Sequence, residues 1–536
     1  MPLDPDALER AYRAPAGPLA PVKNGTSGHR GLTGAGFCDA HVAAMTQALV
    51  DIRQARGTFG PAASDDPAVN LRGGPPGPVV IGKDVRFTSD WALVTAVEVF
   101  AGNGVPVILA QGGRATPTPV VSHAIRAAQA RRENVEGVII TASHNPPDEA
   151  GYKSNGVDGG PNTRTGPVDA RANALLANPS GIRRVPYQQA VQDGLVQEQD
   201  LLTPYLSELD TVVDMDLLRG QRFAATPLGG SAHGVYGQVN ELFGTDIQIF
   251  LDDPDPAACH RTPDWDGKLR GDPSSPYVMR AVQGLRARAG APLIGANDND
   301  ADRFGAEDAT GILNPNHVLC VLFDYLCQHR ALPDGMGLGR TIGTTHMLDR
   351  IAAEHGRPVH EVDVGFKWYV EGLKQGRYVL AGEESAGLSL PRRDGSPWVT
   401  EKDGIAAVLL MMESVVRTGL DLGSQYRLLE QRHGAHAYER VDTLAEPTRK
   451  ARLGALAQHG DEVRRLLQGQ LVAGRAVVGV RVGDGVRVEL DGGLWVLKRP
   501  SGTEDIIKDY REVRDGDIAV ARQASLEIGA LLGLGA

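Results

Sequence analysis

The feature that most constrains the fold is an alternation of short apolar strands with helical segments along most of the chain. Apolar runs at 78–82, 105–110 and 137–142 are separated by helical stretches at 90–101 and 119–132. Such alternation is typical of βαβ units and of a largely parallel sheet. Ligands in these sheets gather at the carboxyl ends of the strands. We therefore look for functional side chains directly after each strand.

Two further blocks repeat this pattern, and a unit of a different kind closes the chain. The second block is expected to have strands at 222–230, 246–251 and 292–298, with a helix ending near 243. The third is expected to have strands at 341–345, 358–364 and 378–382, with helices ending near 354 and starting at 366. Short alternating strands and a helix over 517–532 then indicate an α+β unit. The sequence predicts four domains, at 1–200, 201–316, 317–435 and 436–536.

Composition limits the binding partners and the cellular compartment that we expect for this protein. Lys and Arg number 55 against 66 Asp and Glu, and this net charge of −11 argues against a basic nucleic-acid surface. No stretch approaches the roughly 18 apolar residues of a membrane span, and the first residues have no apolar core of a signal peptide. The four cysteines form no Cys-x-x-Cys pair. We expect a cytoplasmic protein, a monomer or homodimer, with no nucleic-acid or membrane partner.

The first candidate site is Thr-Ala-Ser-His-Asn-Pro-Pro, which places Ser143 just past the strand 137–142. A Gly-x-Ser-x-Gly elbow is missing, so an α/β-hydrolase is disfavoured. His144 is adjacent in sequence, but adjacency alone does not make a nucleophile–base pair. The alternative for this segment is a polar turn begun by Asn145 and Pro146.

The second candidate is an acidic run in which Asp298, Asp300 and Asp302 alternate after the apolar strand 292–298. Alternate residues of an extended segment point the same way, so the three carboxylates can converge on a hard cation such as Mg²⁺ or Ca²⁺. An EF-hand is excluded because Arg303 stands where its glycine is required and Ala309 where its glutamate is required. The alternative is a solvated acidic turn.

Two later motifs are weaker when taken singly. Glu383 and Ser385, again after a strand, could hydrogen-bond vicinal hydroxyls of a sugar. The segment Arg499–Glu504 combines a guanidinium, two hydroxyls and a glycine with backbone N–H groups, which suits a phosphate. Each could also be an ordinary turn.

Together, and in this order, the four motifs resemble those of the α-D-phosphohexomutase superfamily, most closely its bacterial glucose-specific members. The resemblance begins at Gly-Thr-Ser-Gly-His-Arg-Gly (25–31) and runs to Arg499–Glu504, so it covers nearly the whole chain. It implies three similar α/β domains around a central cleft and a C-terminal α+β domain. In chain order, the domains would carry a phosphoserine loop, a metal loop, a sugar loop and a phosphate loop.

The resemblance also implies roles for individual residues. Ser143 would be the phosphorylated nucleophile and, with Asp298, Asp300 and Asp302, a ligand of Mg²⁺, while Arg303 would lie nearby in the substrate site. The remaining substrate-binding residues it implies are Glu383, Ser385, Arg499, Ser501, Gly502, Thr503 and Lys508. Lys153 and Lys367 are both implied as active-site lysines, and the general base stays open between them. Arg30 and His144 would complete the active-site shell.

The implied reaction interconverts glucose 1-phosphate and glucose 6-phosphate through glucose 1,6-bisphosphate, which acts as intermediate and activator. The sugar loop reads Gly-Glu-Glu-Ser (382–385), which favours glucose over the mannose-type and glucosamine-type patterns. The alternatives are a phosphomannomutase or phosphoglucosamine mutase, a non-catalytic sugar-phosphate-binding relative, and a phosphatase that works through phosphoserine.

Overall fold

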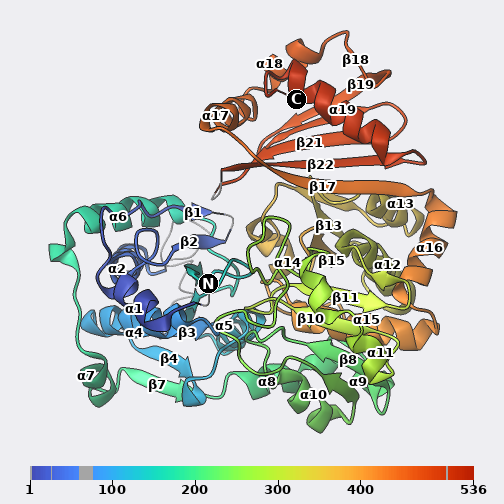
Figure 1. Cartoon of the computed structure of the whole chain (residues 1–536). Helices are drawn as coiled ribbons and strands as arrows, with labels where there is room; N and C mark the ends of the chain where they lie inside the picture. The colour runs from blue at the N-terminus through green and yellow to red at the C-terminus, as the bar shows by residue number, and fades with distance from the viewer. Residues whose placement is uncertain (1–2, 26, 59–75, 503–504, 536) are drawn as a thin grey trace.

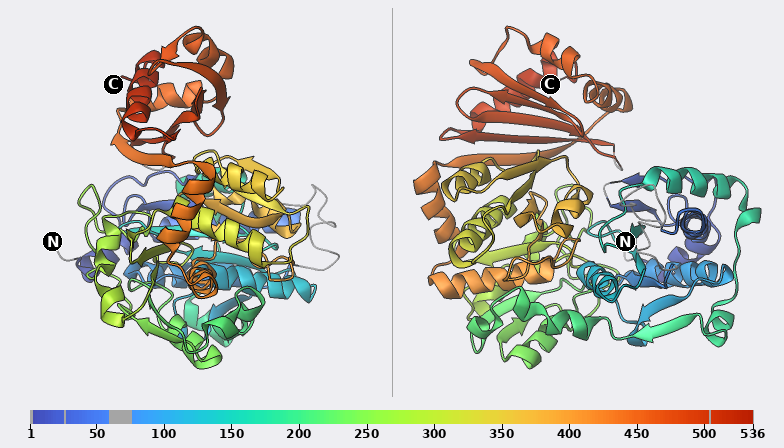
Figure 2. Two further views of the ribbon diagram at one scale, coloured as in Figure 1. Left: turned by 90° about the vertical axis from the view of Figure 1, so that its right-hand side faces the viewer. Right: turned by 180° about the vertical axis from the view of Figure 1, so that it is seen from behind.

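The computed structural model places the chain in four consecutive units, each built on its own β-sheet (Figure 1). It describes residues 3–25, 27–58, 76–502 and 505–535. Units I, II and III lie side by side, and unit IV stands above them as a separate lobe, as the two further views also show (Figure 2). Within the described residues, no helix is long and apolar enough to cross a membrane.

Unit I has a seven-stranded sheet in the order β1-β2-β6-β5-β3-β4-β7. Strands β3, β4, β5 and β7 pair in parallel, whereas β6 runs antiparallel to β5. Its elements are α1 Pro5–Arg13, β1 Asn24–Gly25, β2 Gly28–Leu32, α2 Asp39–Arg56, β3 Val79–Lys83, α4 Phe87–Gly102, β4 Val107–Ala110, η1 Gln111–Gly113, α5 Thr118–Ala130, β5 Glu136–Ile140, β6 Glu149–Asn155, α6 Thr165–Ala177, η2 Pro179–Gly181, α7 Tyr187–Gln192 and β7 Val196–Gln199.

Unit II has a five-stranded sheet in the order β12-β11-β10-β8-β9. Strands β10, β8 and β9 are parallel, and β11 runs antiparallel to β10. Its elements are α8 Leu202–Ser207, η3 Leu209–Thr211, α9 Met215–Leu218, β8 Arg222–Thr226, α10 Val235–Phe243, β9 Asp246–Ile249, η4 Val278–Val282, α11 Leu285–Ala289, β10 Ile294–Asn297, β11 Phe304–Asp308 and β12 Gly311–Ile312.

Unit III has a four-stranded sheet in the order β14-β13-β15-β16, in which only the β15–β16 pairing is antiparallel. Its elements are α12 Pro315–His329, β13 Gly337–Thr341, α13 Met347–Glu354, β14 Val359–Val362, η5 Phe366–Trp368, α14 Val370–Lys374, β15 Tyr378–Glu383, β16 Gly387–Ser389, α15 Gly404–Thr418 and α16 Leu422–His433.

Unit IV is a six-stranded antiparallel sheet in the order β17-β22-β21-β20-β19-β18. Its elements are β17 His436–Leu444, α17 Pro447–Leu456, α18 Gly460–Leu467, β18 Leu471–Val472, β19 Arg475–Val482, β20 Val486–Leu490, β21 Leu494–Pro500, β22 Ile506–Arg514 and α19 Ile518–Leu531. Segregated strands and helices make this an α+β unit, as the sequence predicted.

The first three units share one strand topology. In each, the third strand of the parallel core lies beside the first, the second strand lies on the far side, and an antiparallel strand flanks the third. The loop between the third strand and its antiparallel neighbour is therefore equivalent in all three units. These loops are 141–148 in unit I, 298–303 in unit II and 384–386 in unit III. They contain Ser143, the aspartate run and Ser385 of the sugar motif, whose Glu383 is the last residue of β15.

The hydrophobic cores bind the first three units together. One buried cluster runs through units I to III and includes Val120, Phe223 and Leu319. Unit IV has its own core, and a small buried cluster that includes Ile342 and Trp495 joins it to unit III. Units I to III therefore form a continuous body, whereas unit IV is attached through a limited contact.

Several details differ from the sequence-based expectation. The sheets of units I to III are mixed, because each antiparallel strand returns directly from its loop. The strand predicted at 341–345 lies earlier, at Gly337–Thr341, because a glycine-rich segment pairs between two parallel strands. The helix expected from Phe366 is a short 3₁₀ turn followed by the short α14. The predicted domain boundaries at 200, 316 and 435 stay predictions.

Candidate active site

A cleft of about 1020 Å³ lies where the units meet. Its lining includes Arg30, His144, Arg303, Lys367, Glu383, Ser385, Arg499, Ser501, Gly502 and Lys508. Five of the ten lysines of the chain line it as well: Lys23, Lys367, Lys402, Lys450 and Lys508. The acidic protein thus has a cationic cleft, as an anionic ligand requires.

Ser143 is held in a strained conformation at the base of the loop that follows β5. Its φ of 52° lies in the left-handed region that non-glycine residues rarely occupy. The backbone is held there because its N–H donates to Thr141 Oγ1 at 2.8 Å, and its carbonyl accepts from Arg86 and Asn299 at 2.8 and 2.9 Å. This geometry aims the hydroxyl at unit II, where Ser143 Oγ donates to Asp298 Oδ2 at 2.9 Å.

The carboxylates of Asp298, Asp300 and Asp302 converge, as the alternating pattern predicted. One oxygen of each lies within 4.8 Å of the others, and all three residues are fully buried. Asp300 Oδ1 and Asp302 Oδ1 are buried without a hydrogen-bond partner. Three converging carboxylates, two of which have an unsatisfied oxygen, are a donor set that fits a hard divalent cation.

The electrostatics of this loop are set by burial and by neighbouring cations. Burial, together with Asp300 and Asp302, raises the pKa of Asp298 well above its usual range. Burial alone would raise the pKa of Asp300 too. Lys153, whose Nζ donates to Asp300 Oδ2 at 2.6 Å, outweighs burial with the help of Asp298 and Lys402, so the net pKa is lowered. Burial would lower the pKa of Lys153, yet Asp300 and Asp302 raise it overall. Lys153 therefore holds its proton and neutralises the aspartate loop.

The sugar loop is the third equivalent loop, and it too contains a residue in the left-handed region. Ala386 has φ 67°, and Ala301 of the aspartate loop has φ 56°. The two loops are tied together by Phe304 N–H, which donates to Ala386 O at 3.0 Å. Burial raises the pKa of Glu383 to about 7. Ser385 lines the cleft beside it.

Arg303 links the aspartate loop to the sugar loop. Its Nη1 donates to Ser385 O at 3.1 Å and to Asp272 Oδ1 at 3.2 Å. Burial would lower the pKa of Arg303, but Asp272 and Asp302 raise it overall, so its charge is fixed.

The phosphate motif closes the cleft from unit IV. Arg499 is the second-last residue of β21, and its Nε donates to Asp484. Lys508 on β22 donates to Asp442 Oδ2 at 2.8 Å. Ser501 N–H donates to Ile506 O at 3.0 Å, which shapes the turn. Gly502 lines the cleft, and the predicted Thr503 lies outside the described residues.

The other predicted residues surround Ser143. His144 Nδ1 lies 3.3 Å from Ser143 Oγ. Burial, with Arg303 and Arg30 nearby, lowers the pKa of His144 well below its usual value, so its imidazole is neutral. Arg30 donates to Asn145 Oδ1 at 3.1 Å. Lys367 lines the cleft with its Nζ 5.2 Å from the centre of the Trp368 ring.

Sequence reasoning did not assign roles to four further residues of this centre. Lys402 Nζ lies 3.0 Å from Asp302 Oδ2, and Arg86 supports the Ser143 backbone. Asp272 and Arg440 also line the cleft. Lys402 follows Glu401 and Arg86 lies close to Asp84 in the sequence, but no pattern there assigned them a role. Asp272 gave no signal either, because it lies in a long irregular segment between β9 and β10.

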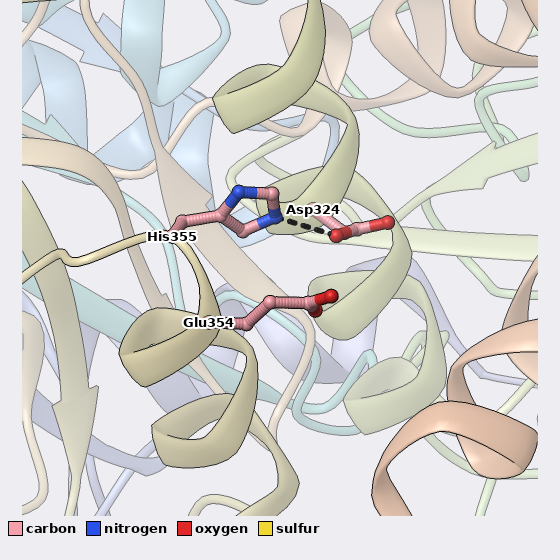
Figure 3. Close-up of side chains that lie close together, drawn as sticks. All are labelled: Asp324, Glu354 and His355. Atoms are coloured by element: carbon pink, nitrogen blue, oxygen red, sulfur yellow. Dashed lines mark hydrogen bonds and ion pairs between the residues drawn. The ribbon is translucent and has the colours of Figure 1, made fainter.

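A second group of metal-type side chains lies on unit III, away from the three loops. Asp324, Glu354 and His355 also bring ligand atoms within 4.8 Å of one another (Figure 3). His355 Nε2 is 2.7 Å from Asp324 Oδ1, and Arg432 donates both to Asp324 and to Glu354. These carboxylates are therefore already paired with a protein cation, and the group joins α12, α13 and α16.

Comparison with known proteins agrees with this arrangement. Residues 21–166 match the family model "Phosphoglucomutase/phosphomannomutase, alpha/beta/alpha domain I", and residues 314–432 match the model for domain III. The chain is 38% identical to a phosphoglucomutase of Komagataeibacter xylinus, over 95% of this chain and 92% of that protein. It is 27% identical to a phosphoglucosamine mutase of Frankia alni, over 95% of this chain and 97% of that protein.

A solved structure supports the fold. The open form of pp63/parafusin, a phosphoglucomutase from Paramecium, has a TM-score of 0.73 and 21% identity, and the match covers 97% of each chain. The match over 97% of each chain shows that the two chains share one overall fold. The chain therefore belongs to the phosphoglucomutase/phosphomannomutase family, in the α-D-phosphohexomutase superfamily.

Proposed function

We propose that this enzyme is a phosphoglucomutase that interconverts α-D-glucose 1-phosphate and glucose 6-phosphate through a phosphoserine at Ser143. The observation that carries the proposal is the approach of Ser143 Oγ to within 2.9 Å of Asp298, at the base of a cationic cleft. A nucleophilic serine, a carboxylate cluster and a distant phosphate loop are the parts that this reaction needs. The 38% identity to a phosphoglucomutase supports glucose as the sugar.

The carboxylates of Asp298, Asp300 and Asp302, with an oxygen of phosphorylated Ser143, would hold Mg²⁺. Hard oxygen ligands of this kind suit that ion. When bound, Mg²⁺ supplies charge neutralisation and polarisation of the phosphoryl group. Lys153 and Lys402 balance the remaining carboxylate charge from two sides.

The substrate binds in two places at once. Arg499, Ser501, Gly502, Thr503 and Lys508 hold the phosphate that is not reacting, while Glu383 and Ser385 hydrogen-bond the sugar hydroxyls. The free hydroxyl then lies at Ser143 and takes its phosphoryl group, which gives glucose 1,6-bisphosphate. This intermediate turns over in the cleft and returns its other phosphate to Ser143. Arg303 and Arg30 offset the charge of the transferring group.

The sugar hydroxyl must lose a proton during transfer. We assign the role of proton acceptor to His144 on geometry, because its Nδ1 lies 3.3 Å from Ser143 Oγ, where the proton is released. Its imidazole is neutral and can accept a proton, although its lowered pKa makes it a weak base. Lys153 is less suited to this role because its ion pairs hold it protonated. Lys367 is further along the cleft wall, and we assign it to substrate binding.

The test is an isomerisation assay with glucose 1-phosphate, mannose 1-phosphate and glucosamine 1-phosphate, in the presence of Mg²⁺ and glucose 1,6-bisphosphate. We expect the highest kcat/KM for glucose 1-phosphate, in a cytoplasmic enzyme that acts as a monomer or homodimer. A preference for mannose 1-phosphate or glucosamine 1-phosphate would overturn the specificity. Release of inorganic phosphate as fast as isomerisation would indicate a phosphatase instead.

A further inference from the structure

An acidic side chain lies in the wall of the cationic cleft, next to the phosphate loop. Asp484 belongs to the hairpin 483–485 between β19 and β20, and it lines the cleft together with Arg499. A carboxylate in this position repels the phosphate of a substrate. We therefore look for a contribution of Asp484 to phosphate binding that outweighs this repulsion.

The contact with Arg499 shows what that role can be. Arg499 Nε donates to Asp484 Oδ2, and the Arg499 side chain is only 8% exposed, against 33% for Asp484. A guanidinium is planar, and its donors form a rigid fork. When a carboxylate holds the Nε edge, the plane is fixed and the edge formed by the two terminal nitrogens is directed away from Asp484. That edge can bind a phosphate through two parallel N–H···O bonds.

The hairpin that contains Asp484 is itself fixed against unit III. Arg481 Nη2 lies 3.2 Å from Asp363 Oδ1, and Arg487 Nη2 donates to Glu361 Oε1 at 3.2 Å. Gly483 is packed so closely that a Cβ there would lie 3.1 Å from Asp363 Oδ1. Asp484 therefore has a defined position from which to hold Arg499.

We propose that Asp484 is a positioning residue for phosphate binding, which acts by fixing the orientation of the Arg499 guanidinium. The inference rests on the proposed function only in taking Arg499 as a phosphate ligand. Lys508 has a comparable partner, since its Nζ donates to Asp442 at 2.8 Å. Both cations of the phosphate site are thus held by a carboxylate of their own unit.

Two substitutions separate orientation from charge. Asp484→Asn keeps an oxygen acceptor for Arg499 Nε–H but removes the negative charge, whereas Asp484→Ala removes both. If Asp484 orients Arg499, the Ala variant should bind inorganic phosphate roughly tenfold more weakly, the effect of losing one charge-assisted hydrogen bond. The Asn variant should bind it at least as tightly as the wild type, because the acceptor remains and the repulsion is gone.

The assay is titration of the Mg²⁺-loaded enzyme with inorganic phosphate by calorimetry, accompanied by KM and kcat for glucose 1-phosphate. We expect the Ala variant to raise KM with little change in kcat. Asp491→Ala, at an exposed turn of the same unit, is the control and should change neither value. Tighter phosphate binding by the Ala variant, or equal weakening by Ala and Asn, would overturn the proposal.

A double-mutant cycle tests whether Asp484 acts through Arg499. In an Arg499→Ala background, Asp484→Ala should cause no further loss of phosphate affinity, and relief of the repulsion should leave that affinity equal or higher. Additive losses would overturn the proposal, because Asp484 would then act independently. Phosphate titration needs no turnover, so an enzyme without isomerase activity would refute the proposed function while the titration still decides the role of Asp484.

Discussion

Lys153 offers the sharpest test of how the buried aspartates are balanced. Its side chain is 3% exposed, and its Nζ donates to Asp300 Oδ2 at 2.6 Å and to Asp302 Oδ2 at 3.1 Å. Lys153→Met would leave these carboxylates buried with one cation fewer, on a side chain of similar length. Removing one partner of a buried ion pair costs about 3–5 kcal/mol. The Lys153→Met variant should therefore be strongly destabilised when no metal is present.

The loss of stability in Lys153→Met can be measured by thermal unfolding of the chelator-treated protein. A loss of about 3–5 kcal/mol lowers the Tm by roughly 6–20 °C, at about 2–4 °C per kcal/mol for a domain of this size class. Added Mg²⁺ should raise the Tm of the variant more than that of the wild type, because the ion replaces the missing charge.

The control is Arg222→Met, which breaks an exposed ion pair with side chains 58% and 35% accessible. Such pairs contribute only about 0–1 kcal/mol, so the Tm should change little. A Lys153→Met variant that is as stable as this control would show that Lys153 does not balance the buried aspartates. So would an equal response of variant and wild type to Mg²⁺.

Three further predictions concern the metal, the sugar loop and the core. Asp300→Asn should raise the Mg²⁺ concentration needed for half-maximal activity by at least tenfold; an unchanged metal titration would contradict the proposed ligand set. Burial raises the pKa of Glu383 from 4.5 to about 7, so its contribution to stability is present below about pH 4 and is lost as the pH rises through 7. Glu383→Gln should abolish sugar binding. The free energy of unfolding of this variant, relative to that of the wild type, should rise by up to about 3 kcal/mol as the pH rises from 4.5 to 8. A Tm difference that does not change with pH would contradict this. Tyr205→Phe removes the buried hydroxyl that donates to Asp403 Oδ1 at 2.8 Å, and we expect a loss of about 1–3 kcal/mol in thermal unfolding; no change would show that Asp403 finds another donor.

The positions of the functional loops could be predicted because strand ends are visible in the sequence. Ser143 and Asp298 each follow a buried apolar run, and functional groups gather at such ends in α/β folds. The equivalence of the three loops could not be predicted, since it depends on which strands pair. The sequence of unit III shows why: the strand Gly337–Thr341 contains two glycines, which strand propensity disfavours, and pairing on both sides overrides that preference.

The strained backbone conformations at the site could not be predicted from the sequence either. Ser143, Ala301 and Ala386 all adopt positive φ, and none is a glycine. Each is held by contacts that long-range folding creates, such as the hydrogen bond from Phe304 N–H to Ala386 O. The ion pair of Asp484 with Arg499 is a further example, because Asp484 lies in the β19–β20 turn, Arg499 lies on β21, and no motif joins them.

In the proposed mechanism Ser143 carries the phosphoryl group during turnover. The most direct test is intact-mass analysis of the Mg²⁺-loaded enzyme before and after incubation with glucose 1,6-bisphosphate, followed by peptide mapping. We predict the gain of one phosphoryl group, located on Ser143 and lost when glucose 1-phosphate or glucose 6-phosphate is added in excess. Ser143→Ala should remain folded, gain no phosphate and lose isomerisation. A phosphoryl group on any other residue, or near-normal turnover by Ser143→Ala, would contradict the account.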